Sequence, residues 1–284
     1  MKEAVSVLEI IKAIIFGIVE GITEWLPISS TGHMIILDDF IKLDCSEEFM
    51  EMFLVVIQLG AILAVVLLFW NKIFPFQFKD KRKPVIEADK IMLWCKIIVA
   101  CIPAAIIGIL FDDMFEALFY HAIPVSIALI AFGVAFIVIE RGNEKRRPRI
   151  RSMEAIDFKT AFMIGIFQLI AAVFPGTSRS GATIVGALLV GVSRTAASEF
   201  TFCLAIPVMF GASLLKMVKF GFSFTGMEAA ILLVGMAVAF FVSVVVIRFL
   251  MDYIKKHDFQ VFGWYRIILG ILVILLNICG IIRV

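Results

Sequence analysis

Charged residues are scarce in this sequence. Of its 284 residues only 18% are charged, whereas 62% are hydrophobic. A soluble domain is about 45–50% apolar. An apolar surplus of this size cannot be buried inside a globule of this length, and a lipid bilayer is the solvent that fits it. The composition therefore predicts an integral membrane protein.

Cysteine is also scarce and follows no metal-binding or disulfide pattern. The chain has five cysteines, an odd number, and none of them forms a CxxC pair. Most lie inside apolar runs, so we expect small buried hydrophobic side chains rather than disulfides or metal ligands. The five residues are Cys45, Cys95, Cys101, Cys203 and Cys279.

Apolar runs long enough to cross a bilayer, about 20 residues each, predict six transmembrane helices. These runs are 51–70, 91–111, 122–140, 198–217, 227–250 and 262–282. Two further apolar regions, 5–36 and 158–192, are broken by Pro, Gly, Ser and charged residues. A broken helix at membrane depth is tolerated only where protein or water surrounds its free backbone groups. We therefore expect both regions to form re-entrant helical hairpins.

The two broken regions also resemble each other. When the chain is shifted by 148 residues, six of the 18 positions from 13 to 30 are identical. This similarity predicts one all-α membrane domain, 1–284, built from two repeats, 1–145 and 150–284. The identical pairs are Ala13 and Ala161, Gly17 and Gly165, Ile18 and Ile166, Ile22 and Ile170, Pro27 and Pro175, and Ser30 and Ser178.

The distribution of Lys and Arg predicts the orientation of the repeats. Segments 72–90 and 141–159 are strongly basic and should face the cytoplasm. Segments 38–51 and 112–116 are acidic and poor in Lys and Arg, so they should lie outside. Each repeat then crosses the membrane an odd number of times, which makes the two repeats inverted. The first hairpin would enter from the outer face and the second from the inner face.

Glu20 and Glu24 are two carboxylates on one face of a helix within an apolar region. Ionised carboxylates are costly there, so the pair is explained if a divalent cation bridges it or if one carboxylate holds a proton. The alternative is that both side chains mark the end of a helix and face water.

A run of hydroxyl side chains and a histidine follows this pair. Ser29, Ser30 and Thr31 lie in the predicted turn, and His33 is one of only three histidines in the chain. A lone histidine is often structural. Here it follows two carboxylates and three hydroxyls closely, and the cluster offers a nucleophile and a proton carrier.

The break in the second hairpin has the composition of a phosphate-binding loop. Its glycines allow close approach to an anion, and hydroxyls and N–H groups at a helix start favour negative charge. Arg179 adds a cation with a bidentate fork suited to phosphate oxygens, although it could instead pair with Glu20, Glu24 or Glu199. The residues are Gly176, Ser178, Arg179, Ser180, Gly181 and Thr183.

Hairpins that enter from opposite faces would meet near the middle of the bilayer. The acidic loop would then supply metal binding and proton transfer, and the basic loop would hold phosphate. This combination suits phosphoryl transfer, in which positioning and charge neutralisation supply most of the catalysis.

Two motifs resemble the signatures of the undecaprenyl-diphosphate phosphatase family, also called the bacitracin-resistance family. The first is Glu-Gly-Ile-Thr-Glu-Trp-Leu-Pro-Ile-Ser-Ser-Thr-Gly-His at 20–33, and the second is Pro-Gly-Thr-Ser-Arg-Ser-Gly-Ala-Thr at 175–183. Segments 56–64 and 191–200 are also similar to family segments. The resemblance spans nearly the whole chain, and its acidic, hydroxyl, His and Arg positions show no departure.

The resemblance implies hydrolysis of a C55 isoprenoid diphosphate to the monophosphate carrier lipid and phosphate during cell-wall lipid recycling. It implies a multi-pass protein of the bacterial inner (plasma) membrane whose site faces the periplasmic side. A divalent cation, Mg or Ca, would be needed, with Glu20 and Glu24 binding it or managing protons. Ser30 or His33 would be the attacking group or its base. The diphosphate would be held by Arg179 with Ser178, and further substrate contacts would come from Ser29, Thr31, Ser180 and Thr183.

Several alternatives stay open at this point. Inverted repeats with broken helices are also typical of transporters, so a transporter or flippase of a phosphorylated isoprenoid lipid is the main alternative function. The attacking group could be Ser30, His33 or a water activated directly. The expected partners are the undecaprenyl diphosphate substrate and membrane lipids, with no nucleic acid; a homodimer is one option for the oligomeric state.

Overall fold

The computed structural model describes residues 2–78, 84–144 and 146–282, so Lys79, Lys81, Arg82, Lys83 and Lys145 of the predicted cytoplasmic segments lie outside the described residues. Within these ranges the chain forms helices and no β-strand, as expected for an all-α protein. The helices are α1 (Lys2–Thr23), α2 (Ser30–Phe40), α3 (Glu47–Val56), α4 (Gln58–Ile73), α5 (Ala88–Phe119), α6 (Ala122–Asn143), α7 (Phe158–Val173), α8 (Arg179–Leu189), α9 (Arg194–Phe220), α10 (Gly226–Tyr253) and α11 (Gln260–Ile278).

Six helical stretches are long and apolar enough to cross a membrane, and all six predicted spans are confirmed in this sense. They are Glu47–Ile73, Ala88–Gly108, Ala122–Asn143, Arg194–Phe220, Gly226–Tyr253 and Gln260–Ile278. The first of them combines α3 and α4, which are separated at Ile57, the residue that caps α3. The predicted span 262–282 ends earlier, because α11 stops at Ile278 and a turn follows.

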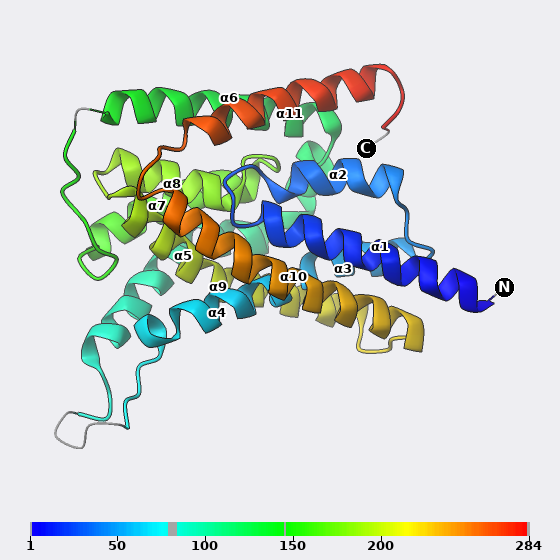
Figure 1. Ribbon diagram of the computed structural model, residues 1–284, viewed down its shortest axis with the longest axis horizontal. Helices are drawn as coiled ribbons and strands as arrows, with labels where there is room; N and C mark the ends of the chain where they lie inside the picture. Colours follow the sequence, from blue (N-terminus) through cyan, green and yellow to red (C-terminus); the bar gives the residue numbers. More distant parts are fainter. Residues whose placement is uncertain (1, 79–83, 145, 283–284) are drawn as a thin grey trace.

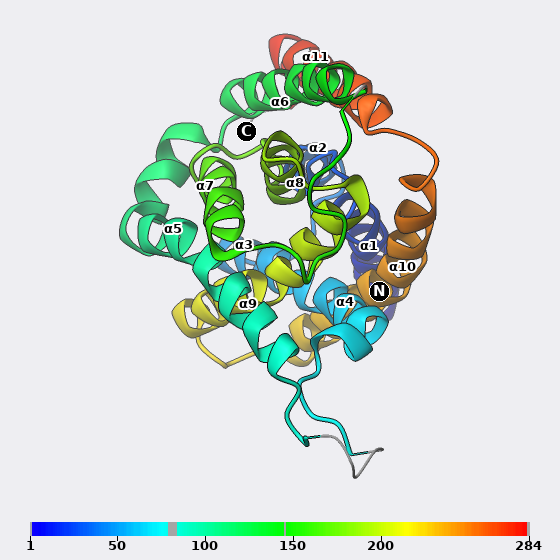
Figure 2. The same cartoon turned by 90° about the vertical axis from the view of Figure 1, so that its left-hand side faces the viewer.

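Both predicted breaks are present. In each broken region a longer helix, α1 or α7, is followed by a short loop and then by an 11-residue helix, α2 or α8. Helix α8 lies in the middle of the bundle and packs against α6, α7 and α9 (Figure 2). Its residues from Ser180 to Leu188 are buried, so most of this short helix lies in the protein interior.

Small residues allow the helices to pack closely. Helix α1 packs against α10, and α7 packs against α5. A Cβ atom at Gly17 of α1 would lie 2.7 Å from the carbonyl oxygen of Gly235, and one at Gly165 of α7 would lie 2.4 Å from that of Ala100. Lipid offers no hydrophobic drive for helix association, so such backbone contacts stabilise the bundle through close packing.

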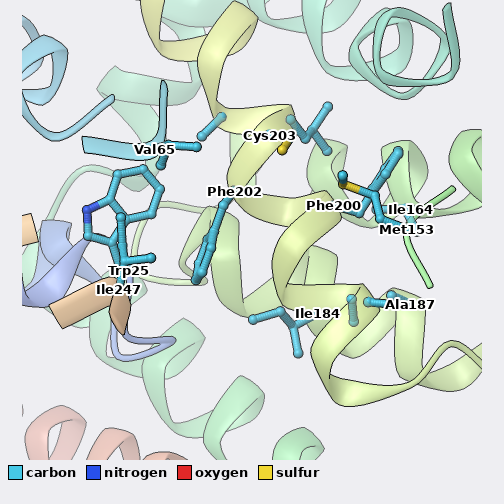
Figure 3. Packing of buried hydrophobic residues seen from close by; sticks show 14 of the residues in the cluster. Trp25, Val65, Met153, Ile164, Ile184, Ala187, Phe200, Phe202, Cys203 and Ile247 are labelled. Atoms are coloured by element: carbon cyan, nitrogen blue, oxygen red, sulfur yellow. The ribbon is translucent and has the colours of Figure 1, made fainter. Parts of the chain in front are cut away.

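The largest apolar cluster surrounds α9 and contacts the first loop (Figure 3). The ring of Trp25, just after α1, meets the ring of Phe202 edge-on, with centroids 5.2 Å apart. Ile184 of α8 belongs to the same cluster. The cluster therefore joins the first loop to the helix that follows the second loop.

The ends of the chain lie on one side of the bundle, and the linker between α6 and α7 lies on the opposite side (Figure 1). On that opposite side Ile150 of the linker pairs with Val192, which precedes α9. The linker is therefore attached to the second half of the chain by backbone contacts.

The five cysteines are all free, as the sequence predicts. Their expected burial is only partly correct. Cys203 is buried and Cys45 and Cys101 are partly buried, but Cys95 and Cys279 are exposed. Cys95 lies on an outward face of α5 and Cys279 follows the end of α11, and at both places an apolar side chain can face lipid.

Candidate active site

The two loops begin their short helices with the same backbone feature. Ser29 and Ser178 are the N-cap residues of α2 and α8, and their φ angles are 74° and 69°. Among the described residues other than glycine, these two have a positive φ. Each serine hydroxyl accepts a hydrogen bond from a glycine N–H three residues later. Such conformations cost free energy and concentrate at functional sites.

This equivalence corrects the register predicted from sequence identity. A shift of 148 aligned Ser30 with Ser178, but the caps align Ser29 with Ser178, a shift of 149. The second loop is therefore one residue longer relative to its preceding helix. The capping geometry, in which the hydroxyl lies three residues before a glycine N–H, gives this register for the two short helices. Ser30 of α2 consequently corresponds to Arg179 of α8, each being the first residue of its helix.

Glu24 joins the two loops. Its Oε2 accepts a hydrogen bond from Ser30 Oγ at 2.8 Å, and its Oε1 pairs with Arg179 Nη2, also at 2.8 Å. Its backbone carbonyl accepts from Ser180 Oγ at 3.1 Å. Glu24 is only 6% exposed, whereas Ser30 and Arg179 are partly exposed. The acidic and basic half-sites predicted from the sequence therefore meet, and of the three carboxylates considered as partners of Arg179 the partner is Glu24.

Glu199 has a different partner from those considered in the sequence. Its carboxylate pairs with Lys72 of α4 at 2.8 Å. This ion pair joins α4 to α9, and Arg179 pairs with Glu24 instead.

Glu20 is buried one helical turn before Glu24. It is 1% exposed, and its Oε1 has no hydrogen-bond partner within the described part of the chain. The described residues contain no group of three or more His, Cys, Asp or Glu side chains arranged to hold a metal ion. Magnesium, however, is commonly held by one or two carboxylates together with substrate phosphates. Glu20 and Glu24 are the residues that could hold a divalent cation in this way.

His33 of α2 faces α11 rather than Ser30. Its Nδ1 lies 2.7 Å from the carbonyl oxygen of Ser29, and its Nε2 lies 2.7 Å from the hydroxyl of Tyr265, on which the ring also stacks. A carbonyl oxygen only accepts hydrogen bonds, so Nδ1 carries the proton and Nε2 accepts from the phenol. Among the described residues no hydrogen bond joins His33 to Ser30 or Glu24.

The remaining predicted substrate contacts divide into two groups. The Ser178 and Ser180 hydroxyls lie 3.2 Å apart at the start of α8, beside Arg179. Thr183, in contrast, is fully buried, and its hydroxyl donates to the carbonyl oxygen of Arg179 at 2.9 Å and accepts from Thr201. Thr183 therefore supports the turn that carries Arg179. Ser29 is occupied as a cap, and Thr31 is partly exposed beside Ser30.

Arg266 of α11 is a site residue that the sequence reasoning missed. It is fully buried, and its guanidinium donates to the carbonyl oxygens of Pro27 at 3.3 Å, Gly176 at 2.9 Å and Thr177 at 2.7 Å. These carbonyls belong to both loops, so one side chain fixes the loops relative to each other. An arginine inside an apolar span is a functional candidate by default, and this signal was present in the sequence.

Comparison with known proteins assigns the chain to a family. A profile of the family described as "Bacitracin resistance protein BacA" matches residues 13–272. The chain belongs to the bacitracin resistance protein BacA family. The matched BacA region includes both loops and Arg266.

Relatives of this BacA family member are similar along nearly their whole length. A protein of Desulfitobacterium hafniense named undecaprenyl-diphosphatase is 67% identical over 270 residues, which cover 95% of this chain and 96% of the relative. One from Enterococcus faecalis with the same name is 62% identical over 274 residues, covering 96% and 99%. One from Clostridium acetobutylicum, named undecaprenyl-diphosphatase 1, is 64% identical over 263 residues, covering 93% and 95%.

Proposed function

We propose that this BacA family member is a membrane hydrolase that converts undecaprenyl diphosphate into undecaprenyl monophosphate and inorganic phosphate. The observation that carries the proposal is that Ser30 and Arg179 both donate hydrogen bonds to the buried carboxylate of Glu24. In this proposal Ser30 is the nucleophile, Glu24 is its base and Arg179 is the phosphate-binding cation, and the hydrogen bonds among the three support these roles. The names of the similar proteins supply the identity of the substrate.

In the proposed first step, Ser30 Oγ attacks the terminal phosphorus and gives its proton to Glu24 Oε2. The bond between that phosphorus and the bridging oxygen breaks, and the lipid monophosphate leaves. Serine is a poor nucleophile without an adjacent base. The 2.8 Å hydrogen bond to Glu24 supplies that base, whereas His33 has other partners.

In the second step a water molecule hydrolyses the phosphoserine. Glu24, after releasing its first proton to solvent, takes a proton from the attacking water and returns it to Ser30 Oγ. Inorganic phosphate is released, and the net reaction consumes one water. Direct attack of water on the diphosphate, with Ser30 only donating a hydrogen bond, is the alternative that the loss of the Ser30 hydroxyl distinguishes.

Arg179 exchanges partners when substrate binds in this proposal. Without substrate one guanidinium nitrogen pairs with Glu24 and another donates to the carbonyl oxygen of Thr201 at 3.1 Å. A phosphate oxygen competes for the nitrogen bound to Glu24, because the planar fork suits bidentate phosphate binding. The start of α8, with the hydroxyls of Ser178 and Ser180, adds donors that favour the same anion.

A divalent cation, Mg or Ca, would be held by Glu20 and Glu24. The unpartnered buried oxygen of Glu20 fits such a role, because an ionised carboxylate in a membrane protein needs a cation or a proton. When bound, the cation neutralises charge on the phosphate oxygens.

We further propose that the two broken regions are re-entrant hairpins of inverted repeats, 1–145 and 150–284. Three observations support this proposal. Helix α1 packs on α10 as α7 packs on α5, and Gly17 and Gly165 are the close contacts of equivalent helices. The N-caps of α2 and α8 share one strained conformation. Helices α6 and α11, which would be equivalent, pack on each other.

For orientation, we propose a multi-pass protein of the bacterial inner membrane with segments 72–90 and 141–159 in the cytoplasm and the site open to the periplasmic side. The basic linker lies opposite the chain ends, which supports this arrangement (Figure 1). Single cysteines placed near Asp38 and near Arg146 in a cysteine-free background should label from opposite sides of the membrane. Labelling of both from the same side would contradict inverted repeats.

The decisive experiment measures phosphate release from C55 isoprenoid diphosphate by purified protein in detergent, with and without a chelator. Wild type should release phosphate, and Glu24→Ala, Ser30→Ala and Arg179→Ala should not. The chelator should stop turnover, and added Mg or Ca should restore it. A transporter needs two compartments, so absence of phosphate release in detergent would favour the transport alternative.

A further inference from the structure

A second charged cavity lies at the end of α8 that is remote from Arg179. It has a volume of about 990 Å³ and is lined by the linker between α6 and α7, the starts of α7 and α9, and the last residues of α8. Helix α8 has 11 residues, and at 1.5 Å per residue it separates the cavity from the candidate active site by about 16 Å. We call this cavity the linker pocket.

The linker pocket has a large excess of positive charge. Six of its lining side chains are basic and two are acidic. The basic residues are Arg146, Arg147, Arg149, Lys159, Arg194 and Lys255, and the acidic residues are Glu140 and Asp157.

Both acidic side chains of the linker pocket already accept hydrogen bonds from other parts of the protein. Glu140 is 1% exposed, pairs with Arg194 and accepts a hydrogen bond from the N–H of Phe259 at 3.1 Å. Asp157 caps α7 by accepting from the Thr160 N–H at 2.7 Å. The hydrogen bonds from Thr160 hold the pKa of Asp157 below its usual range, so this carboxylate stays ionised in its cap. Glu140 is paired with Arg194, and the charge of Asp157 is shared with Lys159 and Lys96, so the two carboxylates offset only part of the positive charge.

Two of the other cations have partners, a carboxylate for Lys255 and a neutral carbonyl group for Arg149. Lys255 pairs with Asp252 at 2.8 Å, and Arg149 Nη2 donates to the carbonyl oxygen of Val190 at 3.4 Å. Arg146, Arg147 and Lys159 take part in no ion pair with the described residues. The linker pocket therefore contains three cations that an added anion would neutralise.

Backbone hydrogen bonds fix the part of the linker that follows Arg146 and Arg147. The N–H groups of Arg149 and Ile150 donate to the carbonyl oxygen of Gly191 at 2.9 and 3.2 Å, and the N–H of Ser193 donates to Ile150 at 2.8 Å. This part of the linker is held against the turn between α8 and α9. The N–H of Arg146 donates to the carbonyl oxygen of Asn143 at 2.9 Å, and Lys159 lies in the first turn of α7. The backbone on both sides of the cations is thus held in place, which lowers the entropy cost of binding.

We propose that the linker pocket binds the phosphate group of an anionic ligand through Arg146, Arg147 and Lys159. Guanidinium forks bind phosphate oxygens by paired, charge-assisted hydrogen bonds. The basic linker is predicted to face the cytoplasm, and basic pockets between helices on that side suit the head groups of anionic lipids. The same chemistry would accept free phosphate. A bound anion would connect the linker to α7 and so stabilise the junction between the two halves of the chain.

The test compares the thermal unfolding of three purified proteins. The first is wild type, and the second is the triple variant Arg146→Gln, Arg147→Gln, Lys159→Gln. The third is a control, Lys81→Gln, Arg82→Gln, Lys83→Gln, which removes the same charge from the other basic segment. Each is measured in nanodiscs of phosphatidylcholine, in an equimolar mixture of phosphatidylcholine and phosphatidylglycerol, and in phosphatidylcholine with added inorganic phosphate. Circular dichroism and size-exclusion chromatography check that all three are folded.

We expect an anion to raise the Tm of wild type and control by on the order of 3 °C, and to leave the triple variant unchanged. A response to phosphatidylglycerol identifies a lipid head group as the ligand, and a response to inorganic phosphate identifies a soluble one. The proposal is overturned if neither anion raises the Tm of wild type. It is also overturned if the triple variant responds as strongly as the control, because the effect would then be general membrane charge.

Discussion

Replacing Arg266 with methionine removes the side chain that connects the two loops without leaving a large cavity. Three loop carbonyls, those of Pro27, Gly176 and Thr177, then lose their donor in the protein interior. Hydrogen bonds between membrane helices average about 0.6 kcal/mol, so three of them give about 2 kcal/mol. At about 1.5 kcal/mol for a bond to a charged group, the loss is about 4.5 kcal/mol.

The free energy of the lost hydrogen bonds, about 2 to about 4.5 kcal/mol, corresponds to a measurable loss of activity. About 1.36 kcal/mol corresponds to a tenfold change in rate, so kcat/KM should fall between roughly 30-fold and 2 × 10³-fold if the loops are mispositioned in the transition state. The assay is phosphate release from C55 isoprenoid diphosphate, with kcat and KM determined separately and the Tm measured in parallel. Since the side chain of Arg266 reaches the site through loop carbonyls and is none of the proposed substrate contacts, the loss should be mainly in kcat.

Two further variants make the Arg266 prediction sharper. Arg266→Lys keeps the charge but cannot bridge the carbonyls of both loops, so it should recover only part of the activity. Arg248→Met, the same change at an exposed arginine of α10, should leave kcat/KM unchanged. The positioning role is refuted if folded Arg266→Met protein keeps kcat/KM within about twofold of wild type, a change below 0.5 kcal/mol.

Three more predictions concern the residues around Glu24 and His33. Ser30→Ala should reduce phosphate release by more than the roughly 10²–10³-fold expected for one lost hydrogen-bond donor; retention of a tenth of the wild-type rate would exclude obligatory attack by Ser30. Arg179→Lys should lose most activity because the fork is lost, and near wild-type turnover, with Arg248→Lys as the control, would argue against phosphate binding there. Tyr265→Phe removes the partner of His33 Nε2 and so loosens the ring whose Nδ1 holds the carbonyl oxygen of Ser29 beside Ser30; if this contact positions Ser30, kcat should fall about fivefold, the equivalent of about 1 kcal/mol, with KM unchanged, and an unaltered kcat would refute the positioning role.

The sequence predicted the helices well because the membrane imposes a minimum length on each apolar run. It did not predict the separation of α3 and α4 at Ile57, because the single polar residue Gln58 does not interrupt the apolar run and no Pro stands at the break. The extension of α5 to Phe119 was also missed, since acidic residues after position 111 suggested a loop. Local composition indicates where a chain can enter lipid, but helix ends depend on the surrounding packing.

For the site, the sequence identified the chemical groups but not their connections. Glu24, Ser30 and Arg179 were all predicted, and their mutual hydrogen bonds follow only from the fold. Arg266 was overlooked because it lies in an otherwise regular apolar span, where the distant carbonyls that it binds cannot be read from neighbouring residues. His33 was grouped with Ser30 by proximity in sequence, yet its ring points toward α11.

The equivalence of Ser30 and Arg179 gives a physical reason for a site made from two similar loops. Each loop ends in a serine cap of the same strained conformation, so each presents the first residue of its short helix in the same way. One loop places a hydroxyl at this position and the other a guanidinium, and both reach the same carboxylate at 2.8 Å. A nucleophile and a cation must approach one phosphate group from different directions for in-line attack. Two short helices that begin in the same way and face each other satisfy this geometry, and at their first positions the two differ in the side chain rather than in the backbone conformation of the cap.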